Sequence, residues 1–152
     1  MDHNEIPQPN KQQIDSARDA VTLARLVLEG QRSDAAHMIE SLLSDPPSIP
    51  GVLYGLCGLI RHALPQDVDP EILFQTAYKP RDAVTLARFV LADDLEDAAD
   101  MIQEILFMDA RSIVGIMDGL CGLIAYALPQ DQDAGVFFQS AYAMLDSVGD
   151  DC

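Results

Sequence analysis

The stretch GLCGLIRHALPQD, residues 55–67, returns almost unchanged as GLCGLIAYALPQD at residues 119–131. The similarity extends outward from this stretch: about 36 of 61 aligned positions are identical when residues 18–43 are shifted by 63 and residues 44–78 by 64. An internal repeat of this length determines the architecture more than any single motif does. The sequence therefore predicts two tandem copies of one module.

Each copy is predicted to form four helices, because apolar residues recur at helical spacing between glycine and proline signals. We assign the copies to residues 16–80 and 81–146, with flexible segments at residues 1–15 and 147–152. The helices are expected over residues 18–28, 33–43, 51–64 and 69–78, and again over residues 82–92, 95–107, 111–128 and 134–146. The long alternation of apolar and polar residues that half-buried strands need is missing. The predicted fold is all-α, with about eight helices.

The net charge of the chain limits the classes of partner that it can bind. Nine Lys and Arg stand against 25 Asp and Glu, so the formal net charge is −16. Such a surface repels nucleic acid and anionic lipid, and it accelerates encounters with basic partners. We therefore expect a basic protein surface as the partner, for instance that of a nucleic-acid-binding protein, and no direct binding of nucleic acid.

The sequence gives no sign of export or of a membrane. A secretory signal pattern is missing from MDHNEIPQPNKQQ, and the longest apolar run, residues 113–128, contains Asp118. That run is also shorter than the ~18 residues that a membrane helix needs. Hydrophobic residues make up 49% of the chain, which excludes wholesale disorder. We expect a cytoplasmic protein that is a monomer or a weak dimer.

Cysteine and histidine give no sign of a metal centre or a catalytic site. Cys57 and Cys121 each stand alone in an apolar helix, without the paired ligands at short spacing that structural zinc requires. They are expected to be small, buried packing residues. His37 and His62 become Asp100 and Tyr126 in the second copy, so the repeats share no histidine pair. We therefore predict no metal, no cofactor and no enzymatic activity.

The repeated glycines predict how the copies meet. Glycine inside a helix costs ~1 kcal/mol relative to alanine, and close helix approach is the expected compensation. We expect the two third helices to lie together at the centre of a pseudo-twofold bundle and to cross antiparallel near Gly58 and Gly122. Asp118 should then approach Arg61 or His62. A rival arrangement stacks the copies by translation and leaves Asp118 on the surface. The residues predicted to pack between the repeats are Gly55, Cys57, Gly58, Arg61, Asp118, Gly119, Cys121 and Gly122.

The largest difference between the copies is an excess of acid in ADDLEDAADMIQE, residues 92–104. Four of its acids lie three or four apart and so share one helix face, opposite Ala98, Met101, Ile102 and Ile105. This face is either a solvated surface or a docking surface for a basic partner. The candidate partner-binding residues are Asp93, Asp94, Glu96, Asp97, Asp100 and Glu104.

Three functions are compatible with these patterns. The first is a non-enzymatic interaction module of the inhibitor, immunity or charge-mimic type, whose acidic face occupies a basic surface. The second is a structural or assembly adaptor that binds a partner helix in an apolar groove. The third is a pocket between the repeats that holds an apolar ligand.

Overall fold

The computed structural model describes residues 11–76, 81–129 and 131–150. Within these ranges the chain forms eight α-helices and one short 3-10 helix, Pro46–Ser48, and no strand. The prediction of an all-α chain with eight helices is confirmed. The α-helices are α1 (Lys11–Leu28), α2 (Arg32–Leu43), α3 (Ile49–Ala63), α4 (Pro70–Thr76), α5 (Arg81–Leu91), α6 (Leu95–Leu106), α7 (Ala110–Ala127) and α8 (Ala134–Asp150).

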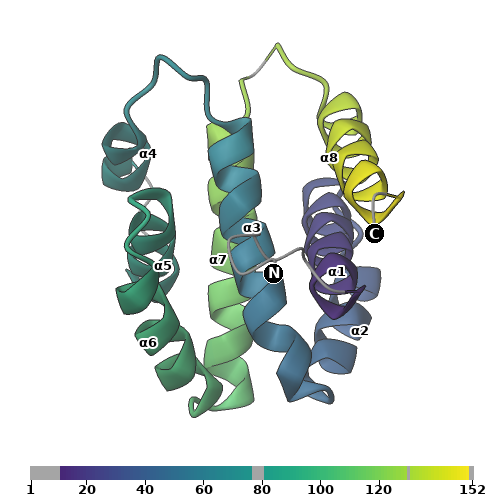
Figure 1. The fold of residues 1–152 in the computed structure, drawn as a ribbon, viewed down its shortest axis with the longest axis vertical. Coiled ribbons are helices and arrows are strands. Elements are labelled where there is room, and N and C mark those ends of the chain that lie inside the picture. The colour runs from purple at the N-terminus through teal and green to yellow at the C-terminus, as the bar shows by residue number, and fades with distance from the viewer. Residues whose placement is uncertain (1–10, 77–80, 130, 151–152) are drawn as a thin grey trace, which may run out of the picture.

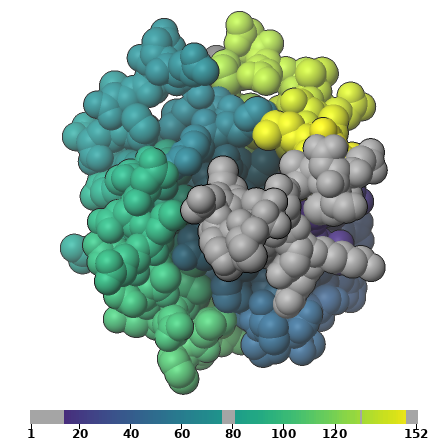
Figure 2. All heavy atoms as spheres, in the orientation of Figure 1, coloured from purple at the N-terminus to yellow at the C-terminus, as the bar shows by residue number. Residues whose placement is uncertain are grey.

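The helices form a central pair with a flank on either side (Figure 1). The pair consists of α3 and α7, which pack against each other. One flank contains α4, α5 and α6, and the other contains α8, α1 and α2; in the space-filling view these flanks lie at opposite edges (Figure 2). Both α1 and α5 contact α3 as well as α7. The core therefore runs through the central pair and is covered from both sides.

The fourth helix of each repeat packs on the first helix of the other repeat, α4 on α5 and α8 on α1. Where α4 packs on α5, the Arg88 guanidinium donates a hydrogen bond of 2.7 Å to the Glu71 carboxylate and lies over the ring of Phe74. Where α8 packs on α1, Thr22 and Tyr142 share a hydrogen bond of 2.6 Å, and Arg25 lies over the Tyr142 ring. The chain thus crosses from one flank to the other after each central helix.

Proline ends both central helices at the same point. Leu64 and Leu128, the residues before Pro65 and Pro129, have extended backbone with ψ of 131° and 129°. The proline ring disfavours helical conformation in the residue before it. The linkers that carry the chain to α4 and α8 therefore begin at equivalent positions in the two repeats.

Two helices extend into segments that were expected to be flexible. Helix α1 begins at Lys11 rather than near residue 18, and Ile14 and Ser16 on its first turns are buried. Helix α8 continues to Asp150. The residues near the start of α1 are mostly polar, so their helical character depends on packing that periodicity does not reveal.

The predicted crossing of the central helices is wrong. Helices α3 and α7 run in the same direction, because both linkers that follow them leave at the same end of the molecule (Figure 1). A Cβ built at Gly58 or Gly122 would meet no described atom within 4 Å, so neither glycine permits a close approach. The close approach is instead to α1: a Cβ at Gly51 would lie 2.5 Å from Ser16 Cβ, and one at Gly55 would lie 2.7 Å from Ala20 Cβ.

These contacts predict opposite effects for two substitutions on one helix. Gly55→Ala should lower the free energy of unfolding by about 1–3 kcal/mol, because the Ala20 Cβ is fixed to the backbone of α1 and the helices must move apart. Gly58→Ala should raise it by ~0.5–1 kcal/mol, because helix propensity improves without a clash. Urea unfolding of both variants tests this, and a loss of stability in Gly58→Ala would contradict it.

Candidate functional site

The acidic surface consists of Asp93, Asp94, Glu96, Asp97, Asp100 and Glu104, on α6 and the turn before it. All six of these side chains are exposed. The opposite face of α6 is buried through Ala98, Ile102 and Ile105. The helix therefore uses its apolar side to pack on the core and presents its carboxylates to solvent, as the spacing of the residues requires.

Negative charge on this surface is poorly compensated. The pKa of Asp97 is raised, first by a side-chain hydrogen bond with Asp94 and then by the charges of Asp94, Asp100 and Glu96. A hydrogen bond between two carboxyl groups requires a shared proton, so the neighbouring charges favour proton uptake. Among the six acids the described residues give an ion pair to Asp93 alone, whose Oδ1 lies 3.1 Å from Arg61 Nη2.

Arg61 ties the start of the acidic surface to the central pair. Its guanidinium also donates to the Val90 carbonyl at 2.7 Å, so it binds the C-terminal end of α5 as well as Asp93. The predicted pairing of Arg61 with Asp118 is therefore wrong. Asp118 is exposed and lines a groove of about 400 Å³ beside α2, with Arg32 and Glu40. Because Asp118 remains in contact with water, it needs no buried partner.

The turn that carries Asp93 is the same in both repeats but differs in sequence. Asp93 has a left-handed backbone, with φ of 61°, and the corresponding Gly30 has φ of 78°. The residue equivalent to Arg61 in the second copy is Ala125. Arginine thus pairs with aspartate here, and the corresponding positions of the other copy hold alanine and glycine. Left-handed conformation favours glycine, so the Arg61 contact compensates a strained aspartate.

The two repeated cysteines have the packing role that their sequence suggests. Cys57 and Cys121 are free and completely buried. Burial is the main reason that each thiol pKa is raised to about 12. At neutral pH these groups are uncharged and unreactive. No group of three or more His, Cys, Asp or Glu that could hold a metal lies within the described ranges.

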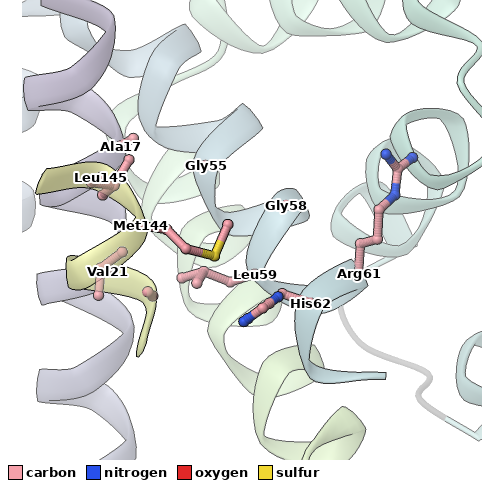
Figure 3. Close-up of a pocket in the computed structure, with 10 residues that line it drawn as sticks. Ala17, Val21, Gly55, Gly58, Leu59, Arg61, His62, Met144 and Leu145 are labelled. Atoms are coloured by element: carbon pink, nitrogen blue, oxygen red, sulfur yellow. The ribbon is translucent and has the colours of Figure 1, made fainter. Parts of the chain in front are cut away.

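A pocket of about 340 Å³ lies between α1, α3 and α8 (Figure 3). Its floor includes Gly55 and Gly58, and Arg61 and His62 lie at one end. The His62 ring also lies 5.4 Å from the ring of Phe137. The remaining walls are apolar: Ala17, Val21, Leu59, Ala141, Met144 and Leu145. We refer to this as the α1–α3–α8 pocket. An apolar groove was among the expectations from sequence, but periodicity alone could not assign these residues to it.

Comparison with known proteins adds no family: no family model, curated protein or solved structure matches the chain. Among the described helices, α7 is long and apolar enough to cross a membrane by length and composition alone. Of this 18-residue stretch, Ala110–Ala127, 44% is buried inside the fold. The core helix of a soluble protein can be equally long and apolar. The functional argument therefore depends on the surfaces described above.

We predict that Cys57 and Cys121 are inaccessible in the folded protein. In a Cys152→Ser variant, which leaves only these two thiols, a disulfide reagent should label neither during the time in which the denatured protein reacts completely. Labelling is read by mass spectrometry. Fast reaction of one thiol, or one equivalent of tightly bound zinc, would contradict the packing role.

The Arg61–Asp93 contact predicts a coupled effect on stability. Asp93→Gly should be almost neutral in the wild type, because relief of left-handed strain offsets the loss of an exposed ion pair worth ~0.2–1 kcal/mol. In an Arg61→Ala background the same change should stabilise the protein by ~1 kcal/mol, because only the strain is removed. Denaturant unfolding of the four proteins measures this coupling. If Asp93→Gly changes the free energy of unfolding equally in both backgrounds, the Arg61 contact does not offset the strain at Asp93.

Proposed function

We propose that this chain is a non-enzymatic interaction module whose acidic surface binds a basic protein surface. The observation that carries this proposal is the exposure of six carboxylates on one helix and its preceding turn, with Arg61 as the single described counter-ion. The raised pKa of Asp97 is consistent with an excess of negative charge at this place. Lysine or arginine side chains from a partner would relieve the repulsion that solvent and salt only screen.

The proposed mode of action is steering followed by charge pairing. A net charge of −16 accelerates the approach of a cationic partner, and the acidic surface then sets its orientation. This suits an inhibitor, an immunity-type protein or a mimic of nucleic-acid charge. A basic nucleic-acid-binding protein is the partner class that such a mimic would occupy. A cytoplasmic location and a monomeric or weakly dimeric state complete the proposal.

An adaptor that binds a partner helix is the second candidate. The α1–α3–α8 pocket favours it, because three helices supply apolar walls and Met144 on its rim is 55% exposed. An exposed apolar residue beside a cavity is a common feature of helix-binding grooves. Salt distinguishes the two candidates, since a complex formed by the acidic surface weakens at high salt and a groove complex does not.

We also propose that the repeats are related by a pseudo-twofold axis along the central pair. The exchange of fourth helices between flanks supports this, because α4 on α5 and α8 on α1 are equivalent contacts. Arg25 and Arg88 occupy equivalent positions, and each reaches the fourth helix of the other repeat. Such an arrangement follows if the chain descends from a homodimer with an isologous interface.

The test of the main proposal is removal of charge from the acidic surface. The change of Asp93, Asp94, Asp97 and Asp100 to Asn should leave the fold intact and weaken capture of basic proteins from the source cell by on the order of tenfold or more. Capture by the wild type should also fall between low and high salt, and reduced repulsion should raise the melting temperature of the variant.

A matched control removes the same amount of charge elsewhere. Four exposed acids outside the acidic surface are changed to Asn: Asp15, Asp34, Asp67 and Asp131. This control should capture the same proteins as the wild type, apart from a modest loss of long-range steering. If both variants lose capture equally, net charge rather than the acidic surface is responsible. If neither loses it, the acidic surface serves only solubility.

A further inference from the structure

We infer that the α1–α3–α8 pocket is the apolar anchor of the same interface, so that the partner segment is both basic and amphipathic. This inference rests on the proposed function, because it places the partner's cationic residues on the acidic surface. It adds that one apolar side chain of the partner enters the pocket. The partner is thereby described by its chemistry: a helical segment with lysine or arginine on one part and a large apolar residue on another.

Arg61 brings the pocket and the acidic surface together. It lies at one end of the pocket, while its guanidinium reaches away from the pocket to Asp93 and the Val90 carbonyl (Figure 3). His62, the next residue, lies on the pocket side of α3 and faces Met144 in the same view. Asp93, the first residue of the acidic surface, is thus linked to the pocket through the Arg61 side chain. A partner that fills the pocket is therefore one arginine side chain away from the start of the acidic surface.

The pocket has the composition of an interface anchor. Its walls are apolar except for Arg61 and His62 at one end, and its volume of about 340 Å³ lies at the small end of the range for ligand pockets. A large apolar side chain in such a pocket, beside a charged rim, is the usual form of a binding hot spot. Met144 on the rim is unbranched and flexible, which lets the opening adapt to the side chain that enters.

Gly58 keeps this pocket open. A glycine within a helix costs ~1 kcal/mol relative to alanine, and no packing among the described residues requires one here, since a Cβ would meet nothing within 4 Å. Any residue other than glycine at position 58 would place side-chain atoms in the pocket. Gly58, Arg61, His62 and Met144 are all exposed, so the pocket opens on the surface rather than inside the fold. These features favour a side chain from a partner over an enclosed ligand.

Charge identifies the occupant. The chain carries a net charge of −16, and Arg61 is already paired with Asp93. An anionic segment would therefore be repelled, whereas a cationic one would be attracted to the acidic surface, which begins at the Arg61–Asp93 ion pair and holds five acids without a described counter-ion. A partner with an apolar residue but no basic residues would fill the pocket without using the acidic surface.

The test uses two synthetic peptides of about 18 residues, long enough for five helical turns. One consists of lysine and leucine, with leucine at helical spacing; in the other, serine replaces every leucine. Fluorescence titration should show that wild-type protein binds the leucine peptide about tenfold or more tightly than the serine peptide. Gly58→Leu should abolish this preference. Gly122→Leu, the equivalent change in the second repeat, should preserve it.

Each outcome separates the anchor from the acidic surface. Equal binding of the two peptides by the wild type, or a leucine preference that survives Gly58→Leu, overturns the anchor and leaves the proposed function intact. If the four-Asn variant of the acidic surface binds both peptides as the wild type does, the proposed function fails. If that variant keeps its leucine preference while binding both peptides more weakly, both ideas stand.

Two further measurements keep the anchor testable. If Gly58→Leu does not fold, Met144→Gln replaces it, because this rim residue is exposed and its length is retained; it should reduce the leucine preference severalfold, and no reduction would count against the anchor. n-Octanol is the competing probe. Octanol that binds the wild type but not Gly58→Leu, and does not displace the leucine peptide, would assign the pocket to a small apolar molecule and overturn the inference; displacement supports the anchor.

Discussion

The packing of α3 against α7 is the contact on which the rest of the structure depends. Each of these helices buries eight residues at equivalent positions. A helix buried over so much of its circumference needs cover from several sides, and helices of both repeats supply it. Helices α1 and α5 therefore each cover both members of the pair. The two repeats share one core and stabilise each other, so the boundary between them in sequence is not a boundary in packing.

The exchange of fourth helices between the flanks follows from the same requirement and also produces the pocket. After each central helix, a proline-terminated linker carries the chain to the flank formed by the other repeat. Helix α8 continues through Met144 and Leu145, which line the α1–α3–α8 pocket, whereas Arg81, the residue that corresponds to Leu145, begins α5. The pocket therefore depends on the length of α8.

The sequence was sufficient to predict those features that depend on local periodicity. The helix number, the proline-defined ends of α3 and α7, the burial of Cys57 and Cys121 and the solvent-facing acids of α6 all follow from spacing. It was insufficient wherever the identity of the neighbouring helix mattered. A glycine signals that space is needed, but Gly55 makes room for α1 and Gly58 leaves a pocket open. Likewise, the partner of Arg61 depended on the direction of two helices, which periodicity leaves undetermined.

One difference between the copies bears on the position of the acidic surface. Arg61 pairs with Asp93, whereas the corresponding residues of the other copy are Ala125 and Gly30. A strained left-handed aspartate would destabilise the turn if it gained nothing in return. Arg61 provides that compensation and also fixes the turn to α3, because it binds the Val90 carbonyl at the end of α5. The first acids of α6 are therefore held at a set position relative to the pocket. A surface held rigidly before binding loses less conformational entropy when a partner binds, so the interaction that we propose would be tighter here than on a flexible tail.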